Sequence, residues 1–127
     1  MSYPENYRYT REHEWVHADG SEVTIGITDH AQHELGDIVF VNLPTAGSNV
    51  KRGETFGSVE SVKAVSDVYS PVTGEVTAAN DLLSQKPETL NTDPHGDGWL
   101  IKVKLAAPEE INGLMSAADY QKYIGTE

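Results

Sequence analysis

Apolar and polar residues alternate along most of this chain, and glycine or proline interrupts the alternation at short intervals. Alternation with a period of two predicts β-strands that bury one face, and the interruptions predict the turns between them. The pattern predicts strands over residues 13–17, 22–28, 37–43, 75–79 and 99–105, and a pair of strands within 56–69 that meet near 62–65. The chain is therefore expected to fold as one mainly β domain over residues 1–127.

Helical signals are restricted to two segments. A short helix is predicted to end at residue 35, because Thr28 or Asp29 can cap its start and Gly36 can terminate it. The segment 108–124 is predicted as the only longer helix. Residues 80–98 are rich in proline and glycine and predict a long loop, either functional or packed over the core.

Composition narrows the classes of function. The 127 residues include 20 acidic and 9 basic side chains, for a formal net charge of −11. Phosphate groups repel so acidic a protein, which argues against binding to nucleic acid or to an anionic membrane surface. The absence of cysteine excludes disulfides, thiolate metal sites and a cysteine nucleophile. With neither a targeting segment nor a membrane-spanning run visible, a cytoplasmic location is expected.

Lys63 is the only basic residue between Arg52 and Lys86, in an interval that carries five acidic residues. The predicted strand pair places it at or beside a hairpin tip, exposed and held by a rigid scaffold. An ordinary surface lysine on a hairpin is the simpler alternative.

Three chemistries are open to the Lys63 amine. A free amine has a pKa near ~10.4, and acidic neighbours would keep it protonated. A Schiff-base lysine usually needs desolvation or a cationic neighbour, and this stretch supplies neither. Acylation by a carrier group requires only exposure at a rigid tip, so the residues favour it without naming the group.

Histidines raise the possibility of metal sites. His13, Glu14 and His17 form a literal H-E-x-x-H pattern, which on a helix places two imidazoles on one zinc ion of a hydrolase. On the strand predicted here, the two histidines would lie about 13 Å apart, too far for one metal ion. His30 and His33 could share one face of the short helix, but no third ligand is evident from the spacing.

Several long motifs resemble the H protein family of the glycine cleavage system, whose members are lipoyl carriers. They are HEWV near the start, TIGITDHAQHELGDIVFVNLP over 24–44, GSVESVKAVSDVYSPVTGEV over 57–76 and LNTDPHGDGWLIKV over 90–103. The resemblance covers nearly the whole chain. It implies a barrel-sandwich hybrid, as in lipoyl and biotinyl carriers, built from two small antiparallel sheets with a short helix near 29–35 and a C-terminal helix.

The resemblance also implies a function. Lipoate would be attached to Lys63 by an amide, and Glu60, Val62 and Ala64 would form the recognition site for the lipoate-attaching enzyme. Such a protein is a non-catalytic shuttle: it takes an aminomethyl group from a pyridoxal-phosphate glycine decarboxylase to a folate-dependent aminomethyltransferase. A flavin (FAD) dihydrolipoyl dehydrogenase then reoxidises the arm. An alternative within the family is to relay lipoate to other lipoyl domains.

The resemblance finally implies an acidic cleft that holds the cationic amine carried by the lipoyl arm. Glu14 and Asp67 match the cleft-lining positions of the family, whereas Glu12 stands where members often have a small hydroxyl residue. Glu34 departs from a histidine found in some members, with His33 beside it. On spacing alone, Glu12 and Glu14 would be read as a solvated face of a strand.

Overall fold

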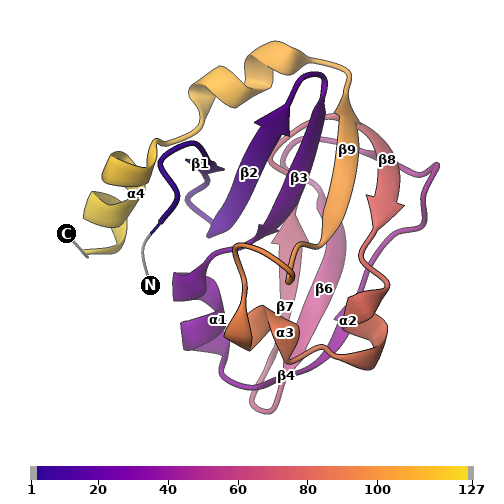
Figure 1. The fold of residues 1–127 in the computed structure, drawn as a ribbon, viewed down its shortest axis with the longest axis vertical. Helices are drawn as coiled ribbons and strands as arrows, with labels where there is room; N and C mark the ends of the chain where they lie inside the picture. Colours follow the sequence, from indigo (N-terminus) through magenta and orange to yellow (C-terminus); the bar gives the residue numbers. More distant parts are fainter. Residues whose placement is uncertain (1–2, 126–127) are drawn as a thin grey trace.

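Two antiparallel sheets form the protein, as seen in a computed structural model that describes residues 3–125 (Figure 1). The larger sheet has the strand order β1-β2-β3-β9-β8-β5 and the smaller sheet the order β4-β6-β7. The six strands of the larger sheet are β1 (Arg8–Tyr9), β2 (Glu14–Asp19), β3 (Glu22–Ile27), β5 (Asn49–Val50), β8 (Gly74–Ala79) and β9 (Ile101–Leu105). The three strands of the smaller sheet are β4 (Ile38–Asn42), β6 (Thr55–Ser61) and β7 (Val65–Tyr69). The mainly β prediction with two antiparallel sheets is confirmed.

The helices are short and lie around the sheets (Figure 1). They are α1 (Asp29–Leu35), α2 (Leu82–Gln85), α3 (Thr89–Thr92), a 3-10 turn over Pro108–Gly113, and α4 (Ala117–Ile124). Helix α1 begins as predicted, because the Thr28 side chain accepts a hydrogen bond from the Ala31 N–H. Among the described residues, none of these helices has the length and apolar character needed to cross a membrane.

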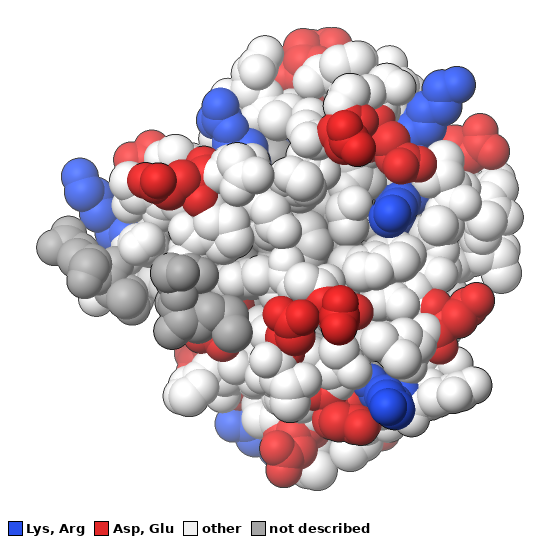
Figure 2. Space-filling view, viewed as in Figure 1, with Lys and Arg blue, Asp and Glu red and all other residues white. Residues whose placement is uncertain are grey.

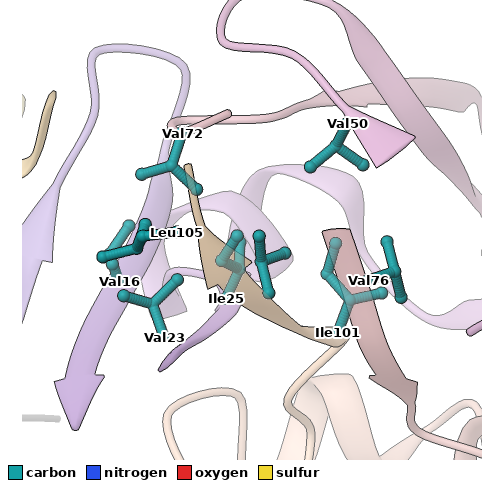
Figure 3. Close-up of a cluster of buried hydrophobic side chains, with 9 residues drawn as sticks. Val16, Val23, Ile25, Val50, Val72, Val76, Ile101 and Leu105 are labelled. Carbon is teal, nitrogen blue, oxygen red and sulfur yellow. The ribbon is translucent and has the colours of Figure 1, made fainter. Parts of the chain in front are cut away.

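The core follows from the alternating pattern. Inward-facing residues of the larger sheet, together with one valine from the connection between β7 and β8, form one buried cluster, shown in Figure 3: Val16, Val23, Ile25, Val50, Val72, Val76, Ile101, Val103 and Leu105. A second cluster lies under the smaller sheet and includes Val59 and Val68. Leu43 and Phe56 pack against both clusters, so the two sheets share one continuous apolar interior.

Two predictions about the second half of the chain were wrong. Residues 80–98 are not a plain loop, because α2 and α3 form within them, and Leu83 and Leu90 anchor both helices in the core. The segment 108–124 is not one helix. It is interrupted at Leu114, whose backbone is extended, and at Met115, which forms an isolated bridge with Tyr9 before Ser116 caps α4.

Residues 3–9 are more structured than their polar composition suggests. Tyr3 and Tyr9 are buried together with Trp15, Ala117 and Tyr120 in a third cluster. Figure 1 shows α4 lying beside β1. The aromatic cluster therefore joins the two ends of the described chain at one side of the larger sheet.

Candidate functional site

Lys63 lies in the turn between β6 and β7 and is exposed, as predicted. Figure 1 shows this hairpin projecting from the body of the protein at the lower edge. The Ser61 hydroxyl accepts hydrogen bonds from the N–H groups of Lys63 (3.3 Å) and Ala64 (3.1 Å) and donates one to the Ala64 carbonyl (3.2 Å). A side chain that bonds the backbone in this way fixes a turn. The amine is thus presented by an ordered tip.

The tip is also bonded to the end of α1. The Val62 N–H donates to the Asp37 carbonyl at 3.0 Å. Beside this bond, a Cβ at Gly36 would lie 3.6 Å from Cε of Lys63, so the lysine stem lies over a residue with no side chain. Gly36 has φ 83° and ψ −157°, a backbone conformation open essentially only to glycine. Helix end and hairpin tip therefore form one unit around the root of Lys63.

The side chains around the tip are exposed and partly apolar. Glu60, Val62 and Ala64, the predicted recognition residues, are all exposed, and Val62 is 69% exposed. Val65 and Phe40 are also large exposed apolar residues, and both pair with Glu60 across the smaller sheet. The surface around Lys63 is accordingly partly apolar and also carries the exposed carboxylates of Glu60 and Asp37.

A pocket of about 260 Å³ lies where the two sheets meet near β1, β2 and β7. Its lining brings together residues from four parts of the chain: Tyr9, Thr10, Arg11, Glu12, Glu14, Arg52, Gly53, Tyr69, Ser70, Pro71, Gly113, Leu114 and Met115. Glu12 and Glu14 both line it; the family resemblance implied a cleft position for Glu14 and marked Glu12 as a departure. The expectation from spacing alone, a solvated strand face for both, was wrong because Glu14 is only 3% exposed.

Hydrogen bonds hold the Glu14 carboxylate at the wall of this pocket. Its Oε1 accepts from the Thr10 hydroxyl at 2.5 Å, and its Oε2 accepts from the Tyr69 N–H at 3.4 Å. Burial raises the pKa of the Glu14 carboxyl to about 7; the bonds from Thr10 and Tyr69 oppose the rise and the Glu12 charge adds to it. A carboxyl of this kind changes charge near neutral pH and favours a cation as its neighbour.

Asp67, the other predicted cleft residue, does not line the pocket. It is exposed on β7, two residues before Tyr69, which does line the pocket. Because side chains alternate along a strand, Val65, Asp67 and Tyr69 share one face of β7. Asp67 therefore lies between the tip that carries Lys63 and the pocket that contains Glu14.

The histidines do not assemble a metal centre. Glu14 begins strand β2, so the helix that the H-E-x-x-H reading needs is absent at these residues, and the hydrolase alternative fails. His13 contacts Tyr120, whereas His17 packs against Tyr7. In the described part of the chain, no group of three or more His, Cys, Asp or Glu side chains is placed to hold a metal ion.

The remaining histidine prediction concerned α1. His30 lies with its ring 4.7 Å from that of His13 and its Nε2 3.9 Å from Glu34, whereas His33 is exposed. His30 and His33 therefore do not face a common metal position. Glu34 is exposed as well, and neither His33 nor Glu34 lines the pocket beside Glu14.

Sequence reasoning missed four residues that shape these sites: Ser61, Thr10, Tyr69 and Tyr120. Ser61 had a local signal, because serine two residues before a turn position commonly bonds the turn backbone. Thr10, Tyr69 and Tyr120 act across sequence separations of 4, 55 and 107 residues, respectively. No local pattern indicates the two longer contacts.

A family model, sequence relatives and a solved structure all match this chain over most of its length. Residues 7–127 match the family model described as Glycine cleavage H-protein. The chain is 57% identical over 127 residues to the glycine cleavage system H protein of Koribacter versatilis, covering all of this chain and 98% of that one. It is 55% identical over 126 residues to that of Halorhodospira halophila, covering 98% and 96%. The crystal structure of a glycine cleavage system H protein from Mycobacterium marinum superposes with a TM-score of 0.89 at 40% identity, covering 97% of this chain and 99% of that one.

Proposed function

Because the chain belongs to the glycine cleavage H-protein family, we propose that it works as a non-catalytic carrier whose lipoyl group is attached to Lys63. It is the shuttle of the glycine cleavage system, moving an aminomethyl group and reducing equivalents between the enzymes. We treat residues 1–127 as one lipoyl-carrier domain with a C-terminal helical extension. A bacterial cytoplasm is the location we propose, in keeping with the bacterial relatives.

The exposure of Lys63 is the observation that carries the proposal. Acylation needs an amine that an enzyme can reach, held by an ordered backbone. Lys63 is exposed, and the hydrogen bonds to the Ser61 hydroxyl order the backbone of the turn. Within the described residues Lys63 makes no ion pair, so attachment breaks no existing interaction there. The residues present therefore fit a lipoyl group, which would supply a dithiolane to a chain that has no thiol of its own.

The buried Glu14 carboxyl is the proposed receptor for the cationic amine cargo. In a partly enclosed site an ammonium group stabilises the carboxylate strongly, since fewer waters screen the pair. Glu12 at the same pocket adds a second negative charge. Asp67 is proposed as a charge along the path from Lys63, because it lies on β7 between the tip and the pocket. The walls around Glu14 limit the access of water, which would otherwise hydrolyse the cargo.

Four partner enzymes follow from this function as proposals. They are a pyridoxal-phosphate glycine decarboxylase, a folate-dependent aminomethyltransferase, an FAD dihydrolipoyl dehydrogenase and the enzyme that attaches lipoate. Figure 2 shows acidic side chains spread over one face of the protein with basic ones between them. An overall charge of −11 favours association with partners that present basic surfaces.

Intact-mass measurement tests the attachment site. The chain is expressed in cells supplied with lipoate, as the natural sequence, as Lys63→Arg and as Lys51→Arg. We expect the mass of one lipoyl group on the natural chain and on Lys51→Arg, which alters another exposed lysine. Lys63→Arg should carry none. Modification that persists in Lys63→Arg, or a natural chain that stays unmodified, would overturn the proposal.

A further inference from the structure

Glu14 follows a turn whose backbone is strained. The Thr10 N–H donates to the Glu14 carbonyl at 2.9 Å, and the His13 N–H donates to the Thr10 carbonyl at 3.2 Å. Within this turn His13 has φ 73°, the only positive φ of a non-glycine residue among residues 3–125. A side chain in the left-handed region costs conformational energy, so neighbouring contacts must hold it there.

The Tyr120 hydroxyl is the contact that holds His13. It lies 2.7 Å from Nδ1 of His13 and 2.7 Å from Oγ1 of Thr28. The Thr28 hydroxyl already accepts from the Ala31 N–H, so its own proton is available to Tyr120. Tyr120 can then donate to Nδ1 of a neutral His13. Burial lowers the pKa of His13, with His30 as a further cause, so the neutral form is favoured.

The surroundings fix Tyr120 itself. Its side chain is 0% exposed, and its ring stacks on that of Tyr9 at 4.9 Å with an interplanar angle of 14°. Tyr9 and Met115 exchange two backbone hydrogen bonds of 2.9 Å, which tie the start of α4 to β1. The Thr28 N–H also donates to the His13 carbonyl at 3.0 Å. His13 is therefore held on both its backbone and its ring.

We propose that Tyr120 is a positioning residue for Glu14: its hydroxyl keeps His13 in the left-handed conformation, and this keeps the next side chain, Glu14, directed at the pocket wall. The C-terminal extension of the domain thereby takes part in holding the cargo. This inference rests on the proposed role of Glu14 as the receptor for the amine. It adds a residue that lies outside the pocket and does not touch the cargo.

The first test measures the carboxyl group of Glu14 directly. The pKa of Glu14 is followed by NMR in the natural chain, in Tyr120→Phe and in Tyr7→Phe. Tyr7 is the matched control, since its hydroxyl donates a comparable bond of 2.9 Å to the His95 carbonyl within the same aromatic region. Both variants lose one tyrosine hydroxyl and should melt below the natural chain, Tyr120→Phe by more because its hydroxyl has two partners.

Only Tyr120→Phe should change the pKa of Glu14. A released turn exposes the carboxyl to water, which lowers its pKa from about 7 toward 4.5. The other charged groups at the pocket, Glu12, Arg11 and Arg52, are unchanged in both variants. His13→Asn is a second variant: asparagine tolerates a positive φ, but its side chain is shorter and does not reproduce the bond to Tyr120. Because asparagine holds the left-handed conformation without that bond, the pKa of Glu14 should stay close to its value in the natural chain.

The second test follows retention of the cargo on the lipoylated protein. We expect Tyr120→Phe to shorten the half-life of the carried aminomethyl group about tenfold, and Tyr7→Phe to leave it within twofold. In a Glu14→Gln background, Tyr120→Phe should have no further effect, because it acts through Glu14.

Three outcomes separate the two proposals. If Glu14→Gln alone leaves the half-life unchanged, the receptor role of Glu14 is wrong, whatever Tyr120 does. If Glu14→Gln shortens it but Tyr120→Phe moves neither the pKa nor the half-life, the positioning role of Tyr120 is wrong. Equal effects of Tyr120→Phe with and without Glu14 would also overturn it.

Discussion

The backbone N–H of Tyr69 donates a hydrogen bond to Oε2 of Glu14 at 3.4 Å. Tyr69 ends β7, the edge strand of the smaller sheet, and Glu14 begins β2 of the larger one. A single carboxyl group therefore joins the sheet that presents Lys63 to the sheet that forms the far wall of the pocket. The buried position that makes this contact also makes Glu14 sensitive to pH and to nearby cations.

Replacing Glu14 should affect cargo retention more than replacing Glu12. Glu14 is buried, so an amine beside it is weakly screened, whereas Glu12 is exposed to water at the same pocket. We expect the half-life of the carried aminomethyl group to fall at least tenfold in Glu14→Gln and less than threefold in Glu12→Gln. Release of the group from purified, loaded protein is the measurement, and equal effects of the two changes would contradict the assignment.

The unloaded protein should lose stability as pH rises from about 4.5 to 7. The pKa of Glu14 is raised in the fold from 4.5 to about 7, so the folded state holds its proton more tightly than the unfolded state. The stabilisation is complete below 4.5 and is lost as pH passes 7. The loss amounts to about 3 kcal/mol of unfolding free energy.

The matched comparison is Glu14→Gln, which cannot titrate. Urea unfolding of both proteins at several pH values isolates the contribution of this carboxyl, since all other groups are shared. The free energy of the natural chain should fall relative to that of the variant across the window. Parallel curves would show that folding does not raise the pKa of Glu14.

Removing the Ser61 hydroxyl should slow lipoylation while leaving the fold intact. Ser61→Ala removes the bonds to the N–H groups of Lys63 and Ala64, so the tip samples more conformations. We expect kcat/KM for attachment to fall about fivefold and unfolding free energy to fall by about 1 kcal/mol. Ser66→Ala, on the same hairpin but without a bond to the tip, is the control and should be lipoylated normally.

Gly26→Ala should destabilise the protein through Trp15. A Cβ at residue 26 would lie 2.6 Å from atoms of the Trp15 ring, which is buried and donates to the Pro94 carbonyl at 2.9 Å. The ring cannot move aside without losing this bond, so we expect a loss of about 2–3 kcal/mol. Thermal unfolding measures it. Gly113→Ala, with open space around the new methyl group, should leave the melting temperature nearly unchanged.

The period-two pattern predicted most of the strands, because a strand with one buried face alternates apolar and polar residues along the chain. The hairpin around Lys63 was predicted for the same reason and lies where expected. The pattern did not predict α2 and α3, since each is only four residues long and is fixed by one leucine in the core. Tertiary contacts, not local propensity, form such short helices.

The burial of Glu14 could not be predicted from the local sequence. Glu14 is followed by Trp15 and Val16, both buried, and a carboxylate before them looks like the solvated start of a strand. The burial of Glu14 depends on its bonds to Thr10 and Tyr69 and on the contact between the two sheets. Tyr69 is 55 residues away, so no local pattern indicates this burial. The break in the helix at Met115 likewise depends on pairing with Tyr9.

The shared face of β7 has a mechanical consequence. One end of β7 adjoins the turn that carries Lys63, the other ends at Tyr69, whose N–H bonds Glu14, and Val65 and Tyr69 are about 13 Å apart at the usual rise along a strand. A lipoyl group attached to Lys63, as proposed, would follow that strand by rotation about its own bonds, with no change in the fold. Delivery and recovery of the cargo would then depend on the flexibility of the tether and not on a conformational change of the two sheets.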